Sequence, residues 1–410
     1  MERILILGAG FAGLWAAVGA VRKIAEHQAQ KEIGVMVVNR TPYHNIRVRN
    51  YEADLSDVRV PLEDVLAPIG AETIVGDVED IDVAGRRVAV GAPGGRRVLA
   101  YDRLVLALGS ETVRPPVPGL AEYGFDVDSY EAASRLDRHL KGLGARPPAP
   151  GQFTAIVVGA GLTGIEVATA LPERLAAARG GSASTEPARI VVVDRQPFVG
   201  SDMGPSARPV IEGALTSLRI EQRVDAGILR IETGGVRLTS GEWIDARTVI
   251  WCAGMRASPL IAMLPVGRDR LGRAPVDESM RVEGVADLYA AGDVASARID
   301  GVHPSVMSCQ HGRPMGRYAG HNVAADLLGA PLLALKIDWY TTILDLGAYG
   351  AVYTEGWDRR VVASGPLAKA TKQTINCKRI YPPLSRRPEE ILEAAAPVVH
   401  APPAIAGAPR

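Results

Sequence analysis

Apolar residues occur in short runs, separated by segments with the spacing of helices, and this pattern recurs along most of the chain. Residues 4–7 and 34–38 are apolar runs of strand length, and residues 14–27 between them have helical spacing. A short continuous apolar run is consistent with a fully buried strand of a parallel sheet. Strands that alternate with helices therefore predict an α/β fold.

Three glycines follow the first predicted strand directly. Gly8 permits the tight turn from strand to helix, Gly10 lets a pyrophosphate approach the backbone, and Gly13 lets helix and strand pack closely. The N-terminus of the next helix offers free N–H groups and a positive dipole end to an anion. A glycine-rich helix start without a ligand has the same letters, but the strand before it favours dinucleotide binding.

The opening pattern begins again at residue 154. An apolar run at residues 155–158 precedes three glycines with the same spacing, Gly159, Gly161 and Gly164. Each copy also has a later strand that ends in a small-residue turn, at Gly109 and at Gly254. Two copies of this pattern are a far more specific signal of dinucleotide binding than one copy. The sequence therefore predicts two dinucleotide-binding modules.

The residue that ends the second strand differs between the two modules. A carboxylate at this position usually binds the adenosine ribose. Asp194 supplies one in the second module, where it would repel a 2′-phosphate and favour NADH over NADPH, although Arg195 weakens that preference. The first module has Asn39, followed by Arg40. The amide oxygen of Asn39 can accept one hydrogen bond from a ribose, or the residue simply ends the strand.

The stretch of residues 286–295 indicates a third strand, which ends at Gly292 and Asp293. An acid at the end of a strand, next to a glycine that allows close approach, can accept hydrogen bonds from a ribityl hydroxyl. The alternative is that Asp293 caps the following helix.

The composition excludes some classes of partner. Lys plus Arg equals Asp plus Glu, at 46 each, so no net charge draws the protein to nucleic acid or to an anionic membrane. The N-terminus has no secretory signal, and no apolar run approaches the ~18 residues that span a bilayer. We therefore expect a cytoplasmic protein without a membrane span, although weak peripheral attachment would need only a basic amphipathic face.

Cysteine and histidine spacing indicates neither a disulfide nor a metal centre. The chain has three cysteines, which lie far apart: Cys252, Cys309 and Cys377. The absence of a closely spaced pair excludes the dithiol reductases and suits a reducing cytosol. The histidines that could serve chemistry are also separate and lack metal-ligand spacing: His44, His303 and His311.

Taken in order, the two glycine loops, the strands ending at Gly109 and Gly254, and the Gly292-Asp293 pair resemble the two-dinucleotide-binding-domain flavoproteins over about residues 1–330. Tyr43-His44 and residues 248–259 and 310–312 are most similar to type II NADH dehydrogenases, which pass electrons from NADH through FAD to quinone. The resemblance implies two Rossmann-like domains, for FAD and for NAD(P)H, the second inserted in the first, with a C-terminal α+β segment.

The resemblance also implies the domain limits. The FAD-binding domain would comprise residues 1–150 and 284–330, and the NAD(P)H-binding domain residues 151–283. A substrate or interface region would follow at 331–385, where aromatic residues crowd together and fit either a strand core or a substrate cage. The tail at 386–410 is Pro- and Ala-rich, and its segment 401–403 looks disordered, as does the segment 180–187.

Individual roles carry over by matching positions. The resemblance makes the first glycine loop and Asp293 contacts of FAD, and the second glycine loop the NADH loop. Gly254 matches the glycine that lets the nicotinamide stack close to the flavin. Glu166 resembles the glutamate that lies near both rings, while its alternative is a carboxylate that interacts with the dipole of its own helix.

The sequence departs from the family at the acceptor side. Gln310 and His311 stand where the family has paired glutamines, and Ser305-Val306 replaces an Ala-Gln pair, which leaves the acceptor open. His311, at the start of a helix, could donate a proton to a reduced quinone. The resemblance places Arg47 near the flavin, where it could stabilise the anionic reduced form. The alternative is that Arg47 is a solvated surface residue.

Residues and resemblance together favour an FAD-dependent NAD(P)H oxidoreductase that transfers a hydride from NADH to FAD and then electrons to a small quinone-like acceptor. NADPH stays open as an alternative donor, and a homodimer is compatible with the sequence. Two other functions stay open: an NADH-dependent reductase of a small iron–sulfur protein such as rubredoxin or ferredoxin, and a nucleotide-sensing flavoprotein with slow turnover. No nucleic-acid partner and no metal are expected.

Overall fold

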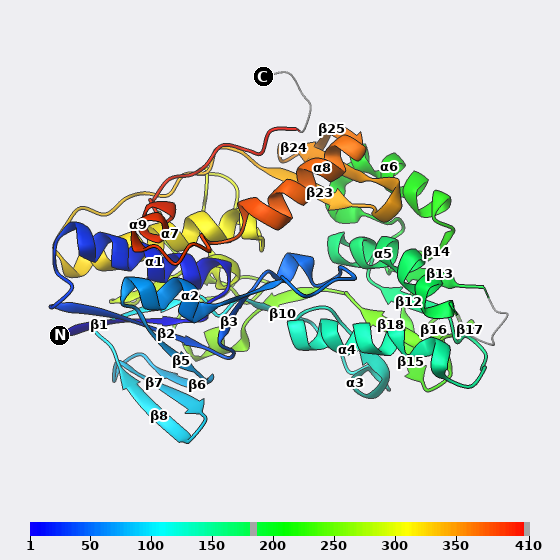
Figure 1. Cartoon of the computed structure of the whole chain (residues 1–410), viewed down its shortest axis with the longest axis horizontal. Helices are drawn as coiled ribbons and strands as arrows, with labels where there is room; N and C mark the ends of the chain where they lie inside the picture. The colour runs from blue at the N-terminus through cyan, green and yellow to red at the C-terminus, as the bar shows by residue number, and fades with distance from the viewer. Residues whose placement is uncertain (181–186, 406–410) are drawn as a thin grey trace.

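The structure, a computed structural model, describes residues 1–180 and 187–405. The segment 180–187, which looks disordered in the sequence, falls almost entirely outside these residues, as does the end of the tail at 406–410. Figure 1 shows two lobes, with the C-terminal region lying across both of them.

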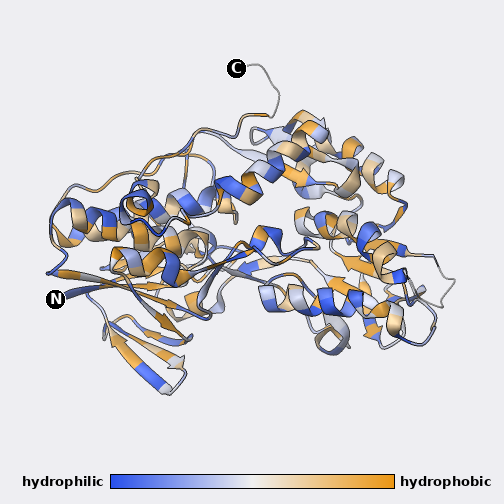
Figure 2. Ribbon diagram, viewed as in Figure 1, coloured by the Kyte–Doolittle hydropathy of each residue, from blue (hydrophilic) through white to orange (hydrophobic). Residues whose placement is uncertain are grey.

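A five-stranded parallel sheet forms the core of the first domain, in the strand order β21-β9-β1-β2-β5. Its strands are β1 (Glu2–Leu7), β2 (Ile33–Asn39), β5 (Glu72–Val75), β9 (Arg103–Leu106) and β21 (Leu288–Ala290). The side chains from Ile4 to Leu7 are fully buried. Because both faces of a parallel sheet are covered, β1 is continuously apolar and does not alternate. Figure 2 shows these strands as hydrophobic ribbons.

The second domain repeats this arrangement with the strand order β11-β18-β12-β13-β14. Its elements are β11 (Gly124–Phe125), β12 (Thr154–Val158), α5 (Leu162–Arg179), β13 (Arg189–Val193), α6 (Gly204–Ser217), β14 (Ile220–Arg223) and β18 (Thr248–Trp251). Strands β12, β13, β14 and β18 occupy the places that β1, β2, β5 and β9 have in the first sheet. The predicted α/β fold with two repeated modules is confirmed.

The second domain begins earlier in the chain than residue 151. Strand β11 pairs with β18, and helix α4 (Tyr130–Lys141) buries Leu136 and Leu140 in the core of the second domain. An antiparallel pair, β10 (Ser110–Thr112) with β19 (Met255–Ala257), links the two domains. The chain has Pro- and Gly-rich breaks at both 114–119 and 145–151, and local composition does not show which of them separates two cores.

Helix α7 (Cys309–Leu327) lies against α1 (Phe11–Glu26), the helix that follows the first glycine loop (Figure 1). Two glycines allow this close approach. A Cβ atom on Gly316 would lie 2.2 Å from the Ala12 carbonyl oxygen, and one on Gly320 would lie 2.1 Å from that of Ala16. The position of the first loop therefore depends on a helix that begins about three hundred residues later in the chain.

Each domain also contains a three-stranded antiparallel sheet, which is inserted in the chain between two strands of the parallel sheet. The two sheets are formed by β6 (Asp77–Asp82), β7 (Arg87–Ala92) and β8 (Gly95–Ala100), and by β15 (Ile228–Glu232), β16 (Gly235–Leu238) and β17 (Trp243–Asp245). Short elements complete both domains: β3 (Tyr43–Asn45), β4 (Arg59–Pro61), α2 (Leu62–Leu66), α3 (Leu120–Tyr123), β20 (Ala274–Pro275) and β22 (Ala295–Ser296).

The C-terminal region forms a small sheet and helices that cover the junction of the domains. Its elements are β23 (Thr341–Asp345), β24 (Ala351–Glu355), β25 (Arg360–Gly365), α8 (Pro366–Thr374), a π-helical turn (Ile375–Arg379) and α9 (Pro388–Ala394). Ile391 of α9 is fully buried in the core of the first domain. Helix α9 therefore anchors the first part of the Pro- and Ala-rich tail, through one apolar side chain that only the folded domain provides with a partner.

Among the residues that the structure describes, no helix is both long enough and apolar enough to cross a membrane.

Candidate functional site

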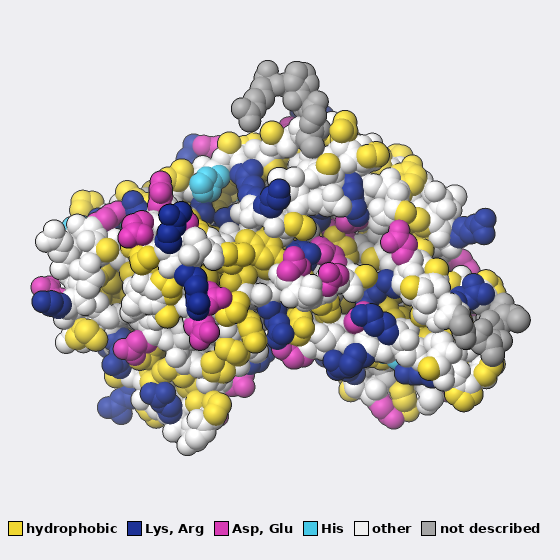
Figure 3. All heavy atoms as spheres, in the orientation of Figure 1, with side chains coloured by type: hydrophobic (Ala, Val, Ile, Leu, Met, Phe, Trp, Pro, Cys, Tyr) yellow, Lys and Arg dark blue, Asp and Glu magenta, His cyan; other side chains and the backbone are white. Residues whose placement is uncertain are grey.

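A cavity of about 780 Å³ lies where the two domains meet the C-terminal region. Figure 3 shows hydrophobic side chains gathered at the centre of one face, between the two lobes. Both glycine loops and the C-terminal region contribute to the cavity wall, through Gly10, Phe11, Gly161, Thr163, Tyr340 and Ile380. The fold thus brings the two predicted dinucleotide loops to one cavity.

The first glycine loop has the geometry of a phosphate cradle. A Cβ atom on Gly8 would lie 2.3 Å from the Ala107 carbonyl oxygen, and one on Gly13 would lie 1.8 Å from that of Gly8. No atom lies within 4 Å of the corresponding position on Gly10, which lines the cavity. The N-terminus of α1 also has no side-chain cap. Its free N–H groups and open approach fit the pyrophosphate of a dinucleotide.

The second loop repeats this geometry at the start of α5. A Cβ atom on Gly164 would lie 1.8 Å from the Gly159 carbonyl oxygen, as at Gly13, and the helix again lacks a side-chain cap. One difference is an acid: Asp202 Oδ2 would lie 2.7 Å from a Cβ atom on Gly161. Because Asp202 is exposed, it can turn aside when a phosphate binds.

Asn39 and Asp194 make equivalent contacts in the two modules. Asn39 Oδ1 accepts a hydrogen bond from the backbone N–H of Ala9 at 2.9 Å, and Asp194 Oδ2 accepts one from that of Ala160. Asn39 Nδ2 also donates to the Thr41 and Tyr43 carbonyls, at 2.8 and 3.1 Å. Each residue therefore ties its second strand to its own glycine loop.

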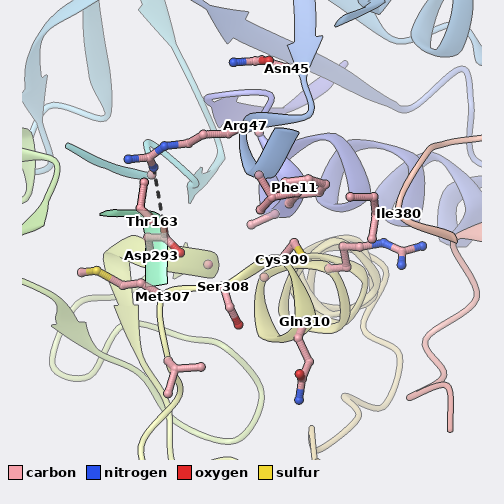
Figure 4. Close-up of a pocket in the computed structure, with 18 of the residues that line it drawn as sticks. Phe11, Asn45, Arg47, Thr163, Asp293, Met307, Ser308, Cys309, Gln310 and Ile380 are labelled. Carbon is pink, nitrogen blue, oxygen red and sulfur yellow. Dashed lines mark ion pairs between the residues drawn. The ribbon is translucent and has the colours of Figure 1, made fainter. Parts of the chain in front are cut away.

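Polar groups around Asp293 converge on the cavity. Ser110 Oγ donates to Asp293 Oδ2 at 2.6 Å, and Arg47 Nη1 lies 3.8 Å from the same oxygen. Figure 4 shows Arg47 reaching toward Asp293 across the cavity. Arg47 also pairs with Asp128, and Arg40 with Asp77. Burial raises the pKa of the Asp293 carboxyl, which Ser110 and Arg47 counteract.

The other predicted glycines also lie at the site. Gly109, Gly254 and Gly292 line the cavity, each with a positive φ, of 71°, 81° and 73°. A Cβ atom on Gly292 would lie 2.7 Å from that of Ala12, so this position admits only glycine beside α1.

Glu166 is held by a cation that the sequence analysis did not identify. Lys372 Nζ donates to Glu166 Oε1 at 2.7 Å, and the backbone N–H of Asp345 donates to the same oxygen at 3.1 Å. Burial raises the pKa of the Glu166 carboxyl, while Lys372 opposes this shift. Both residues line the cavity. No local motif marks Lys372, because it lies 206 residues from its partner.

Gln310 and His311 have different surroundings in the structure. Gln310 lines the cavity, where Thr341 Oγ1 lies 3.4 Å from its Oε1. His311 is fully buried, outside the cavity lining, and its Nδ1 accepts a hydrogen bond from the Val306 backbone N–H at 2.9 Å. Burial lowers the pKa of His311 to about 4. An acceptor in the cavity would therefore reach Gln310, whereas His311 supports the loop before α7.

Residues 2–316 match the family described as pyridine nucleotide-disulphide oxidoreductase. The chain belongs to this family. An NADH dehydrogenase-like protein of Mycobacterium tuberculosis is 56% identical over 402 residues, which cover 97% of this chain and 99% of that protein. A type II NADH:quinone oxidoreductase of Staphylococcus haemolyticus is 25% identical and covers 93% of this chain and 95% of its own.

The structure of NDH2 from Plasmodium falciparum superposes on this oxidoreductase with a TM-score of 0.76 at 12% identity, covering 97% of this chain and 99% of that one. This likeness confirms the fold. The sequence relatives confirm the relationship to type II NADH dehydrogenases, and the protein is an NADH-dependent flavoprotein oxidoreductase. The two loops described above fit the FAD and NADH that this class uses.

Disulfide chemistry has no support at the site of this oxidoreductase. Cys252 and Cys309 both line the cavity, and all three cysteines are free. Burial raises the pKa of both thiols. A protonated, unpaired thiol is a poor nucleophile, so neither residue is suited to thiol–disulfide exchange.

Proposed function

We propose that this oxidoreductase passes electrons from NADH through FAD to a small quinone-like acceptor. The observation that carries the proposal is that one cavity joins both glycine loops to an apolar wall from the C-terminal region, formed by Trp339, Tyr340, Ile343 and Ile380. Flat aromatic rings suit such a wall. The relative from Staphylococcus haemolyticus, named as a quinone oxidoreductase, supports the same acceptor class.

FAD, when bound, accepts a hydride from NADH and passes electrons to the second substrate. The chain supplies binding and orientation. The loop at Gly10 would hold the FAD pyrophosphate with Asp293 near the ribityl chain, and the loop at Gly161 would hold NADH. The Glu166–Lys372 pair places a buried carboxylate and its cation on the cavity wall, where a proton can be held beside a reacting ring.

The test is anaerobic stopped-flow spectroscopy. The protein is loaded with FAD, reduced with one equivalent of NADH, and mixed with a soluble quinone or with a small iron–sulfur carrier protein. We expect NADH to bleach the flavin faster than NADPH does, and the quinone to reoxidise it within the turnover time. Reoxidation by the carrier protein alone would favour the carrier reductase, and no reoxidation by either would favour the sensor.

A small acceptor is favoured over a carrier protein because the aromatic wall lies inside the cavity. Tyr340 is only 7% exposed and is stacked on Trp357, with ring centroids 4.5 Å apart. A docked protein would reach the rim of such a site, whereas a planar small molecule can enter it.

A further inference from the structure

Three arginines line one end of the cavity, where residues close to the end of the described chain also lie. They are Arg313, Arg317 and Arg379, and Val398, Val399 and His400 close the same end. We call these three arginines the arginine pocket. Arg313 and Arg317 lie one turn apart on α7, the helix whose first turn carries Gln310.

Among the residues that the structure describes, no carboxylate balances the arginine pocket. Across residues 1–180 and 187–405, none of the three guanidinium groups forms an ion pair. Arg317 is 3% exposed, and its Nε is buried without a hydrogen-bond partner, while its Nη1 donates a long hydrogen bond to the Val398 carbonyl, at 3.5 Å. Arg313 Nε is likewise buried without a partner, and Arg379 donates to the Ala401 carbonyl.

Three positive charges stay close together in this pocket. Burial, followed by the neighbouring arginines, lowers the pKa of Arg317 to about 9, and burial lowers that of Arg313 to about 10. Both side chains are therefore still charged at neutral pH. Burying like charges without a counter-ion is unfavourable, so the pocket favours the binding of an anion.

The guanidinium groups are held in place for such a ligand. Two of the three lie over the Trp15 ring of α1, with Arg317 Cζ 4.5 Å and Arg313 Cζ 5.2 Å from its centroid. Stacking on an indole fixes a guanidinium plane and leaves its edge N–H groups free to bind an anion.

The pocket is separate from the phosphate cradle of the first loop. The guanidinium groups of Arg313 and Arg317 lie over Trp15. Trp15 is four residues beyond Phe11, which is about 6 Å along α1 from the glycine loop. Ile380, next to Arg379, shares the cavity wall with Phe11 and Cys309, as Figure 4 shows. The pocket therefore belongs to the side of the cavity that we assign to the acceptor.

We infer that the arginine pocket binds an anionic group, of the carboxylate or sulfonate class, carried by the electron acceptor beside its reducible ring. This inference rests on the proposed function. A planar guanidinium can bind both oxygens of such a group at once, and Arg313 and Arg317 approach it from one face of α7.

The test compares naphthoquinone sulfonate with unsubstituted naphthoquinone as acceptors for the FAD-loaded, NADH-reduced protein. The readout is the ratio of the two kcat/KM values, anionic over neutral. We expect Arg317→Gln to lower this ratio about tenfold or more, the effect of losing one charge-assisted hydrogen bond. Arg379→Gln, at a half-exposed position, is a second variant that tests the same pocket if Arg317→Gln fails to fold.

A matched control exists in the second domain. Arg208 also lies over an aromatic ring, with Cζ 3.5 Å from the Phe198 centroid and a buried Nε without a partner, but it does not line the cavity. Arg208→Gln is expected to keep the wild-type ratio. An unchanged ratio in both pocket variants overturns the inference, as does loss of FAD from Arg317→Gln, which would identify the FAD phosphates as the anion.

The failure of the proposed function gives a different result. If the wild-type protein reduces neither quinone, the acceptor class is wrong. Calorimetry with naphthalene sulfonate then tests directly whether the arginine pocket binds an anion. Binding by the wild type that Arg317→Gln weakens tenfold supports an anion site. The absence of binding by the wild type contradicts it.

Discussion

At the scale of single residues, Asn39 and Asp194 make the same contact in the two domains, although their side chains differ in charge. Each ties the end of its second strand to a loop N–H, so Asp194→Asn retains an acceptor for the Ala160 N–H and removes only the negative charge. We expect the preference for NADH over NADPH, measured as the ratio of kcat/KM values, to fall about tenfold. A preserved ratio would show that Asp194 does not face the 2′ position. Arg40→Gln, in the first domain, is the control and should not change the ratio.

A second residue-scale prediction concerns the Glu166–Lys372 pair. Lys372→Met leaves a buried carboxylate without its cation, which is expected to lower the free energy of unfolding at pH 7 by roughly 3–5 kcal/mol. Urea unfolding measures this loss. The double variant with Glu166→Gln is expected to recover much of it, because no buried charge is then left alone.

The pH dependence of this pair has a definite sign. Burial raises the pKa of Glu166, and Lys372 lowers it, so removal of Lys372 raises that pKa further. A raised pKa stabilises the folded state below the unfolded pKa of about 4.5, and this contribution disappears as the pH rises through the folded pKa. The difference in stability between wild type and Lys372→Met should therefore shrink toward acid pH. A constant difference between pH 4 and pH 8 would contradict the assignment.

At the scale of elements, the crossing of α1 and α7 places the first glycine loop. Gly316→Ala would put a methyl group 2.2 Å from the Ala12 carbonyl oxygen and force the helices apart. We expect a loss of about 1–3 kcal/mol in stability and at least about tenfold weaker FAD binding, since the N-terminus of α1 moves with the helix. Urea unfolding and FAD titration measure these effects.

Gly267→Ala is the matched control, because nothing lies within 4 Å of its Cβ position. Its stability is expected to stay within about 0.5 kcal/mol of wild type. Equal effects of the two substitutions would show that helix crossing does not set the loop position.

At the scale of the whole molecule, the last described residues close one end of the cavity. Tyr353 Oη donates to the Pro403 carbonyl at 3.0 Å, and Val398, Val399 and Pro403 line the cavity. A chain that ends after Ala395 keeps α9 and its buried Ile391 but loses this wall. We expect it to fold, with iodide quenching of bound FAD fluorescence raised about twofold or more by access of water. A chain that ends after Ile405 is the control, and equal quenching in both would contradict the closing role.

The sequence by itself determined the two modules, their glycine loops and the polar residues that end their strands. These features are local: a glycine at Gly8 or Gly159 is required by the backbone turn it makes, and a buried parallel strand must be apolar throughout. The family relationship follows from the same local motifs. The resemblance that these motifs carry also indicated Asp293 and Glu166 as residues near the bound cofactors.

Only the tertiary structure decided what surrounds those residues. Lys372 pairs with Glu166, although the two are 206 positions apart in the sequence. The arginine pocket lacks a counter-ion among the described residues, because no acid of another described element packs there. Helix α9 is ordered because Ile391 packs into the core of the first domain. The burial of His311 and the place of β11 in the second sheet depend equally on distant elements. Charge pairing and burial are properties of neighbours in space, and a linear pattern of residues does not specify those neighbours when the chain returns from far away.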